Sequence, residues 1–152
     1  MKRFVVAFLL VTGPGVAGAQ VPVSYHPPLV NQYIEDGLEQ RSPAWWKALE
    51  SQLALTLDKP VEQVDEVSLQ NVIYFATNHS DRVRLTDSAP FLMEIYERHQ
   101  HAGFRMMALA ALHAIGDERY LARAYSLTRH ANSERMNRMA RAALADVREK
   151  NR

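Results

Sequence analysis

Three histidines, His99, His101 and His113, are the residues whose type and spacing come closest to a metal site. Neutral imidazole binds zinc and copper well, so this set could supply three ligands in an exported protein. The chain has no cysteine, no His-x-x-x-His spacing on a predicted helix and no carboxylate pair that would complete the site. We therefore expect surface histidines, no resident metal and no other cofactor. A small histidine-based metal-binding or metal-sensing periplasmic protein is the alternative.

The sequence also lacks the patterns that catalysis needs. It has no Gly-x-Ser-x-Gly turn, no cysteine nucleophile and no glycine-rich phosphate loop. Asp87, Glu94 and Glu97 share one predicted helix, where they are typical of a solvated face rather than of an acid–base pair. Aromatic residues are sparse among the basic residues of the C-terminal part, which disfavours nucleic-acid binding. We expect neither an enzyme nor a nucleic-acid-binding protein.

The N-terminus has the pattern of a secretory signal peptide. Lys2 and Arg3 precede an apolar run over 4–11, and Ala17-Gly18-Ala19 is a small-residue cleavage site. We expect cleavage after Ala19, which would place the protein in the periplasm or outside the cell. Residues 20–41 contain three prolines and are expected to be extended or weakly helical. No later run is apolar enough to span a membrane, so we expect no span after cleavage.

The rest of the chain has helical rather than strand periodicity. Ser42 offers an N-cap with Pro43 in the first turn, and Gly116 is predicted to lie just past the C-terminus of a helix, where glycine is common. Asn132-Ser133 is the expected start signal of the last helix. The predicted helices cover 43–59, 65–78, 86–100, 103–115, 117–130 and 133–149.

One passage occurs twice, in 106–115 and in 138–147, at an offset of 32 residues. A period of this length indicates stacked helical units, because each unit is too small to bury its own apolar face. We therefore predict an all-α fold for 42–152, a short α-solenoid of about three antiparallel helix pairs at 42–79, 86–116 and 117–149. The identical positions are Met107/Met139, Ala108/Ala140, Ala110/Ala142, Ala111/Ala143 and Leu112/Leu144.

The first copy reads Arg105-x-x-Ala108-x-x-Ala111-Leu112-x-x-Ile115-Gly116-Asp117, and Pro90 stands 15 residues before Arg105. This combination resembles the second-helix signature of short HEAT-like repeats, of the kind first noted in phycobilisome lyases. The resemblance implies an α-solenoid that binds a partner, and it does not imply lyase chemistry. One position departs from the pattern, because Asn137 stands in the second copy where Arg105 stands in the first.

The divergent positions of the two copies predict the partner surface. In solenoids the second helices line the concave binding face, and positions three and seven apart share one side of a helix. The predicted surface comprises Met106, Leu109, His113, Arg138 and Arg141. Residues 20–97 carry twelve acidic and five basic groups, whereas 98–152 carry five and eleven. These features predict a non-catalytic scaffold whose protein partner has a hydrophobic anchor and an acidic rim.

Overall fold

The computed structural model describes residues 37–128 and 133–152, and over these ranges the chain is helical with no strand. The predicted signal peptide over 1–19 and most of the 20–41 segment lie outside the described residues. The all-α prediction is confirmed. The helices are α2 (Pro43–Leu57), α3 (Glu66–Asn78), α4 (Ala89–Arg98), α5 (Ala102–Ile115), α6 (Glu118–Thr128) and α7 (Glu134–Lys150). Short 3₁₀ turns η1, η2 and η3 cover Leu38–Gln40, Val61–Gln63 and Leu85–Ser88.

Local chemistry sets the helix ends. The Ser42 side chain accepts the backbone N–H of Trp45 at 3.3 Å, and Pro43 follows in the first turn of α2. Ser133 caps α7 in the same way, accepting the N–H of Met136. Gly116 ends α5 with a φ of 77°, a left-handed conformation that favours glycine. These three sequence predictions are confirmed.

The helix predicted from Thr86 begins three residues later. Pro90 has no backbone N–H, so it cannot bond the Thr86 carbonyl as an α-helix would require. That carbonyl instead accepts the N–H of Ala89, and Leu85–Ser88 forms a 3₁₀ turn before α4. The segment predicted over 117–130 is helical up to Thr128, and its last two residues lie outside the described residues.

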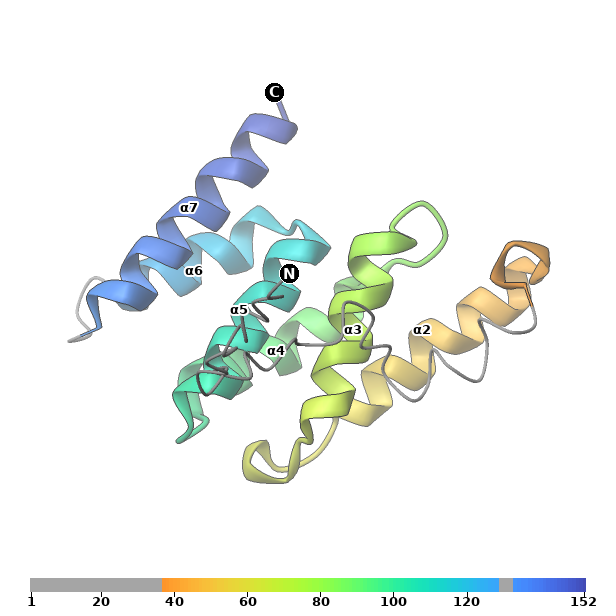
Figure 1. Ribbon diagram of the computed structural model, residues 1–152, viewed down its shortest axis with the longest axis horizontal. Helices are drawn as coiled ribbons and strands as arrows, with labels where there is room; N and C mark the ends of the chain where they lie inside the picture. Colours follow the sequence, from red (N-terminus) through yellow and green to blue (C-terminus); the bar gives the residue numbers. More distant parts are fainter. Residues whose placement is uncertain (1–36, 129–132) are drawn as a thin grey trace, which may run out of the picture.

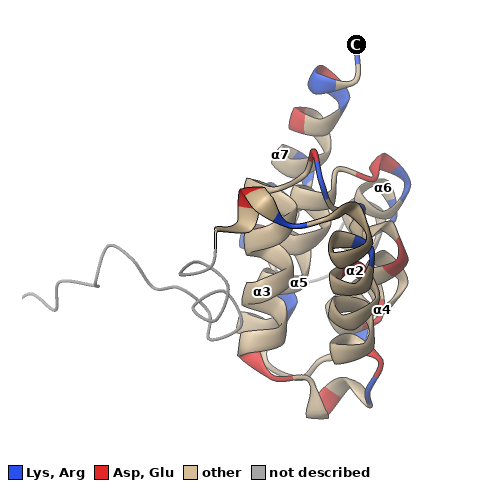
Figure 2. Cartoon of the chain, turned by 90° about the vertical axis from the view of Figure 1, so that its right-hand side faces the viewer, with Lys and Arg blue, Asp and Glu red and all other residues tan. Residues whose placement is uncertain are grey.

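The six α-helices form two layers, with α2, α4 and α6 in one and α3, α5 and α7 in the other (Figures 1 and 2). Within the layers α3 packs on α5 and α5 on α7, while α2 packs on α4 and α4 on α6. Between the layers, the most extensive packing joins α4 to α5 and α6 to α7. None of the helices in the described part of the chain combines the length and apolar character needed to cross a membrane.

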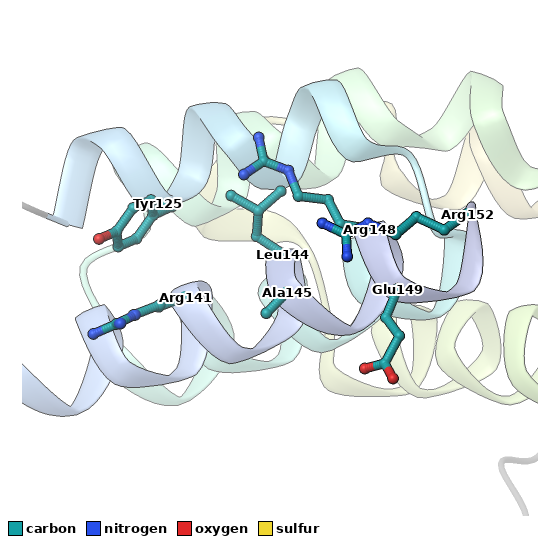
Figure 3. A pocket seen from close by; sticks show the side chains of 7 residues that line it. All are labelled: Tyr125, Arg141, Leu144, Ala145, Arg148, Glu149 and Arg152. Carbon is teal, nitrogen blue, oxygen red and sulfur yellow. The ribbon is translucent and has the colours of Figure 1, made fainter.

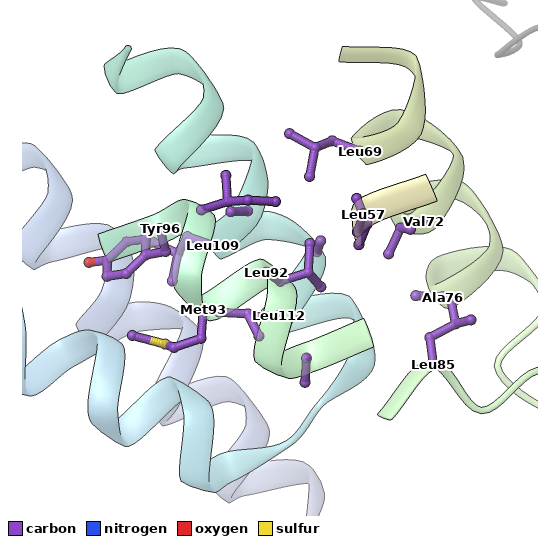
Figure 4. Close-up of a cluster of buried hydrophobic side chains, with 14 of the residues drawn as sticks. Leu57, Leu69, Val72, Ala76, Leu85, Leu92, Met93, Tyr96, Leu109 and Leu112 are labelled. Carbon is purple, nitrogen blue, oxygen red and sulfur yellow. The ribbon is translucent and has the colours of Figure 1, made fainter. Parts of the chain in front are cut away.

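Burial recurs with the offset seen in the sequence. Figure 4 shows the central part of the core, where Leu92 and Tyr96 of α4 meet Leu109 and Leu112 of α5. Both members of each equivalent pair are at most 8% exposed, so α4–α5 and α6–α7 bury corresponding faces. These pairs are Ala89/Leu121, Leu92/Ala124, Tyr96/Thr128, Ala108/Ala140, Ala111/Ala143 and Leu112/Leu144.

Candidate interaction surfaces

The five residues of the predicted partner surface do not form one continuous stripe. Leu109 is 2% exposed and belongs to the core, so its assignment to a partner surface is wrong for this fold. Met106 is half-buried and packs against the same core. The physical reason is the position of α5, which contacts α3, α4, α6 and α7 and is therefore covered around most of its circumference.

His113 does lie at the surface, near the end of α5. Its Nε2 atom lies 2.7 Å from Oδ2 of Asp146 on α7, and Lys150 donates to the same oxygen at 2.7 Å. All three side chains are between 39% and 68% exposed. The hydrogen bonds from Lys150 and then from His113 lower the pKa of Asp146, so this carboxyl is ionised at neutral pH. The contact between His113 and Asp146 therefore links the C-terminal part of α5 to that of α7.

An open groove of about 520 Å³ runs beside this cluster and is lined by all three helices of one layer. The α3 side contributes Ile73, Ala76 and Thr77, and the other sides are largely small or apolar residues together with Lys150 and Asn151. The remaining lining residues are Ser80, Ala110, His113, Ala114, Gly116 and Val147. This arrangement offers an apolar surface with a polar rim to a protein partner.

Of these groove residues, only His113 was among the predicted partner residues. The α3 contribution was missed because the repeat pattern is weak over 72–81, where little but hydrophobic patterning survives. Ala110 and Ala142 are identical in the two copies and both are exposed. Only Ala110 lines the groove, so neither divergence nor identity between the two copies marks the groove residues.

Arg138 and Arg141 lie on a different side of α7 from the residues that line this groove. Arg138 pairs with Glu134 at 3.1 Å, one turn earlier on the same helix. Arg141 lines a separate groove of about 550 Å³ between α6 and α7 (Figure 3). The structure therefore separates the two predicted arginines from His113.

The predicted histidine ligands have other contacts. His99 is 4% exposed and stacks on Phe104, with ring centroids 4.3 Å apart and planes 1° from parallel. Its Nδ1 accepts the backbone N–H of His101, and its Nε2 lies 3.7 Å from Oε2 of Glu62. His113 contacts Asp146 instead. Within 37–128 and 133–152, no group of three or more His, Cys, Asp or Glu side chains is placed to hold a metal ion. The expectation that His99 is a surface residue is wrong, because its ring is part of the packing.

The carboxylates that share α4 form ordinary ion pairs. Glu94 pairs with Arg98 at 2.6 Å, and Glu97 pairs with Arg123 of α6 at 2.7 Å. Glu94 is 47% exposed, and its partner Arg98 is 70% exposed, so water screens this pair. Glu94 therefore lies on a solvated face as the sequence predicted, whereas the Glu97 side chain is only 25% exposed and Asp87 lies in η3, before α4.

Comparison with known proteins identifies no relative: no protein-family model, no curated protein and no solved structure matches this chain. The resemblance to HEAT-like repeats therefore rests on the residues of the chain itself.

Proposed function

We propose that this chain is a non-catalytic protein-interaction module of the periplasm or extracellular space, built as a short HEAT-like solenoid. The three proposed antiparallel pairs are α2 with α3, α4 with α5 and α6 with α7. The two-layer order of the helices and the recurrence of buried positions at the sequence offset support this architecture. The signal peptide predicted over 1–19 is the basis for the proposed location.

We place the main binding surface in the groove formed by α3, α5 and α7, hereafter the second-helix groove. One observation carries this proposal: three helices that are far apart in sequence present small or apolar side chains to one open groove. Stacked helical repeats commonly bind partners along the face lined by their second helices. Ile73, Ala110 and Val147 would receive an apolar anchor of the partner.

The polar side chains at the groove would set the orientation of the partner. His113 and Lys150 line it and share the carboxylate of Asp146, which lies between them. Rim charges of this kind influence association rate and register more than affinity. A partner helix or loop with an apolar ridge and flanking polar groups fits this chemistry.

The test uses a matched pair of alanines. Ala110 lines the second-helix groove, whereas its repeat equivalent Ala142 is exposed outside it. The tagged chain, Ala110→Arg and Ala142→Arg are each used to capture proteins from an envelope extract, and the captured proteins are quantified by mass spectrometry. We expect a protein that is enriched by the wild type and by Ala142→Arg and is lost with Ala110→Arg. Equal capture by all three forms would contradict the proposed surface.

A further inference from the structure

The α6–α7 groove, on another side of α7 from the second-helix groove, is a second surface with its own chemistry. Arg138, Arg141, Ala145 and Arg148 follow one another at intervals of three or four residues on one face of α7, and Arg152 lies two residues beyond the end of that helix. In Figure 3, Arg141 and Tyr125 of α6 lie at one end of the groove, and Arg148 and Arg152 lie toward the other. Leu144 and Ala145 lie between them. The result is an apolar strip with guanidinium groups at both ends.

Two of these guanidinium groups are available for a partner. Arg148 donates from Nε to Glu118 at 2.7 Å, and Arg138 is held by Glu134. Arg141 and Arg152, by contrast, make no ion pair with any described residue of the chain. A guanidinium group prefers the two-pronged geometry of a carboxylate or phosphate. The charge of the groove therefore selects an anionic occupant.

The lining favours a peptide over a uniform polyanion. Glu149 also lines the groove, and it would repel a closely spaced row of phosphates while it can accept an N–H from a peptide backbone. Arg141 and Arg152 are eleven residues apart, which is about 16 Å at the rise of a helix. An extended peptide covers that distance in about five residues. Acidic residues at positions i and i+5 of a peptide would match this spacing, with an apolar side chain between them on Tyr125 and Ala145.

We propose that the α6–α7 groove binds an extended acidic segment of a partner protein, in which two carboxylates flank an apolar side chain. Arg141 and Arg152 bind the carboxylates, and the strip formed by Tyr125, Leu144 and Ala145 receives the apolar side chain. This site does not depend on the second-helix groove, because the two grooves share no lining residue. A negative result for one groove therefore leaves the proposal for the other groove unchanged.

The test is a fluorescence-anisotropy titration of the full chain with a labelled peptide, Gly-Glu-Ser-Leu-Trp-Ser-Glu-Gly. We expect saturable binding that weakens as salt is added, and that falls about tenfold in the double variant Arg141→Ala, Arg152→Ala. The matched control is Arg135→Ala, an exposed arginine of α7 that does not line the groove. This control should bind as the wild type does, and Ala110→Arg in the other groove should also leave binding unchanged.

Two altered peptides separate the contribution of the carboxylates to binding from that of the apolar side chains. Replacement of both glutamates by glutamine, or of Leu-Trp by Gly-Ser, should each weaken binding, because the first removes the charge and the second removes the apolar anchor. The proposal is overturned by an absence of saturable binding, by an equal loss in Arg135→Ala, or by tighter binding to anionic phospholipid vesicles or a single-stranded oligonucleotide than to the peptide. Circular dichroism of each variant would verify that the helices are intact.

Discussion

Arg105 and Asn137 occupy equivalent positions in α5 and α7, and each side chain reaches the end of the preceding helix. Arg105 donates from Nε to the carbonyl of Tyr96 at 2.8 Å, and its guanidinium group lies 5.8 Å from the centre of the Tyr96 ring. That carbonyl belongs to the last turn of α4, where helical partners are missing. Asn137 donates to the Thr128 hydroxyl at a longer 3.5 Å. Asn137 therefore also links its helix to the end of the preceding helix, but through a longer hydrogen bond.

Arg105→Ala should therefore destabilise the fold more than Asn137→Ala. Loss of a charged hydrogen bond at a half-buried helix end costs about 1.5–3 kcal/mol, and loss of the long neutral bond of Asn137 should cost less. Urea denaturation followed by circular dichroism measures both values. If Arg105→Ala leaves the free energy of unfolding unchanged, this arginine does not stabilise the junction between α4 and α5.

Asp65 links the stability of the fold to pH. Burial alone would raise the pKa of its carboxyl, but hydrogen bonds from the Ser68 backbone and side chain and from Lys59 outweigh burial and lower it below 3.8. A lowered pKa in the folded state contributes stability that is present above the unfolded value and is lost as the pH falls through the folded pKa.

Asp65→Asn keeps a helix-capping oxygen but cannot titrate. Between about pH 5 and pH 2 the wild type should lose more unfolding free energy than the variant does, because only the wild type must protonate a stabilised carboxylate. Thermal melts over this range provide the comparison. Parallel pH profiles for the two proteins would show that the capping carboxylate does not contribute to acid stability.

At the scale of helices, the sequence correctly predicted those helix ends that are fixed by contacts between residues close together in the chain. Ser42, Gly116 and Ser133 act through bonds within one turn, so their roles can be inferred without the tertiary structure. The start of α4 was misplaced because the 3₁₀ turn before it depends on the missing N–H of Pro90 and on burial of Leu85 and Ser88. Long-range packing also decides that Leu109 is buried.

Leu112 and Leu55 provide a matched test of the packing. Leu112 on α5 is fully buried, whereas Leu55 on α2 is 67% exposed. Leu112→Ala should lower the unfolding free energy by about 2–5 kcal/mol, through lost burial and the cavity that remains. Leu55→Ala should change it by less than about 0.5 kcal/mol. Similar melting temperatures for the two variants would contradict the assignment of α5 to the core.

For the whole molecule, the repeated passage predicted the helical class and the equivalence of α5 and α7, but not how the surfaces are divided. Two copies of one pattern do not reveal that α5 is surrounded by four helices whereas, among the described residues, α7 packs mainly against α5 and α6. As a result, the residues of the predicted partner surface lie in different places. Leu109 is in the core, His113 lines the second-helix groove and Arg141 lines the α6–α7 groove. The arginines of α7, which are Arg135, Arg138, Arg141 and Arg148, are all exposed.

The most direct test of the proposed function is site-specific photo-crosslinking in the native envelope. A photoreactive phenylalanine analogue is placed at Ala110 or Thr77 in the second-helix groove, and at Ala142 or Ser126 outside it, all of which are exposed. We expect illumination to yield the same discrete protein adduct from both groove positions and none from the two outside positions. Adducts of equal yield at all four positions, or adducts only from Ala142 and Ser126, would contradict a partner bound in the second-helix groove.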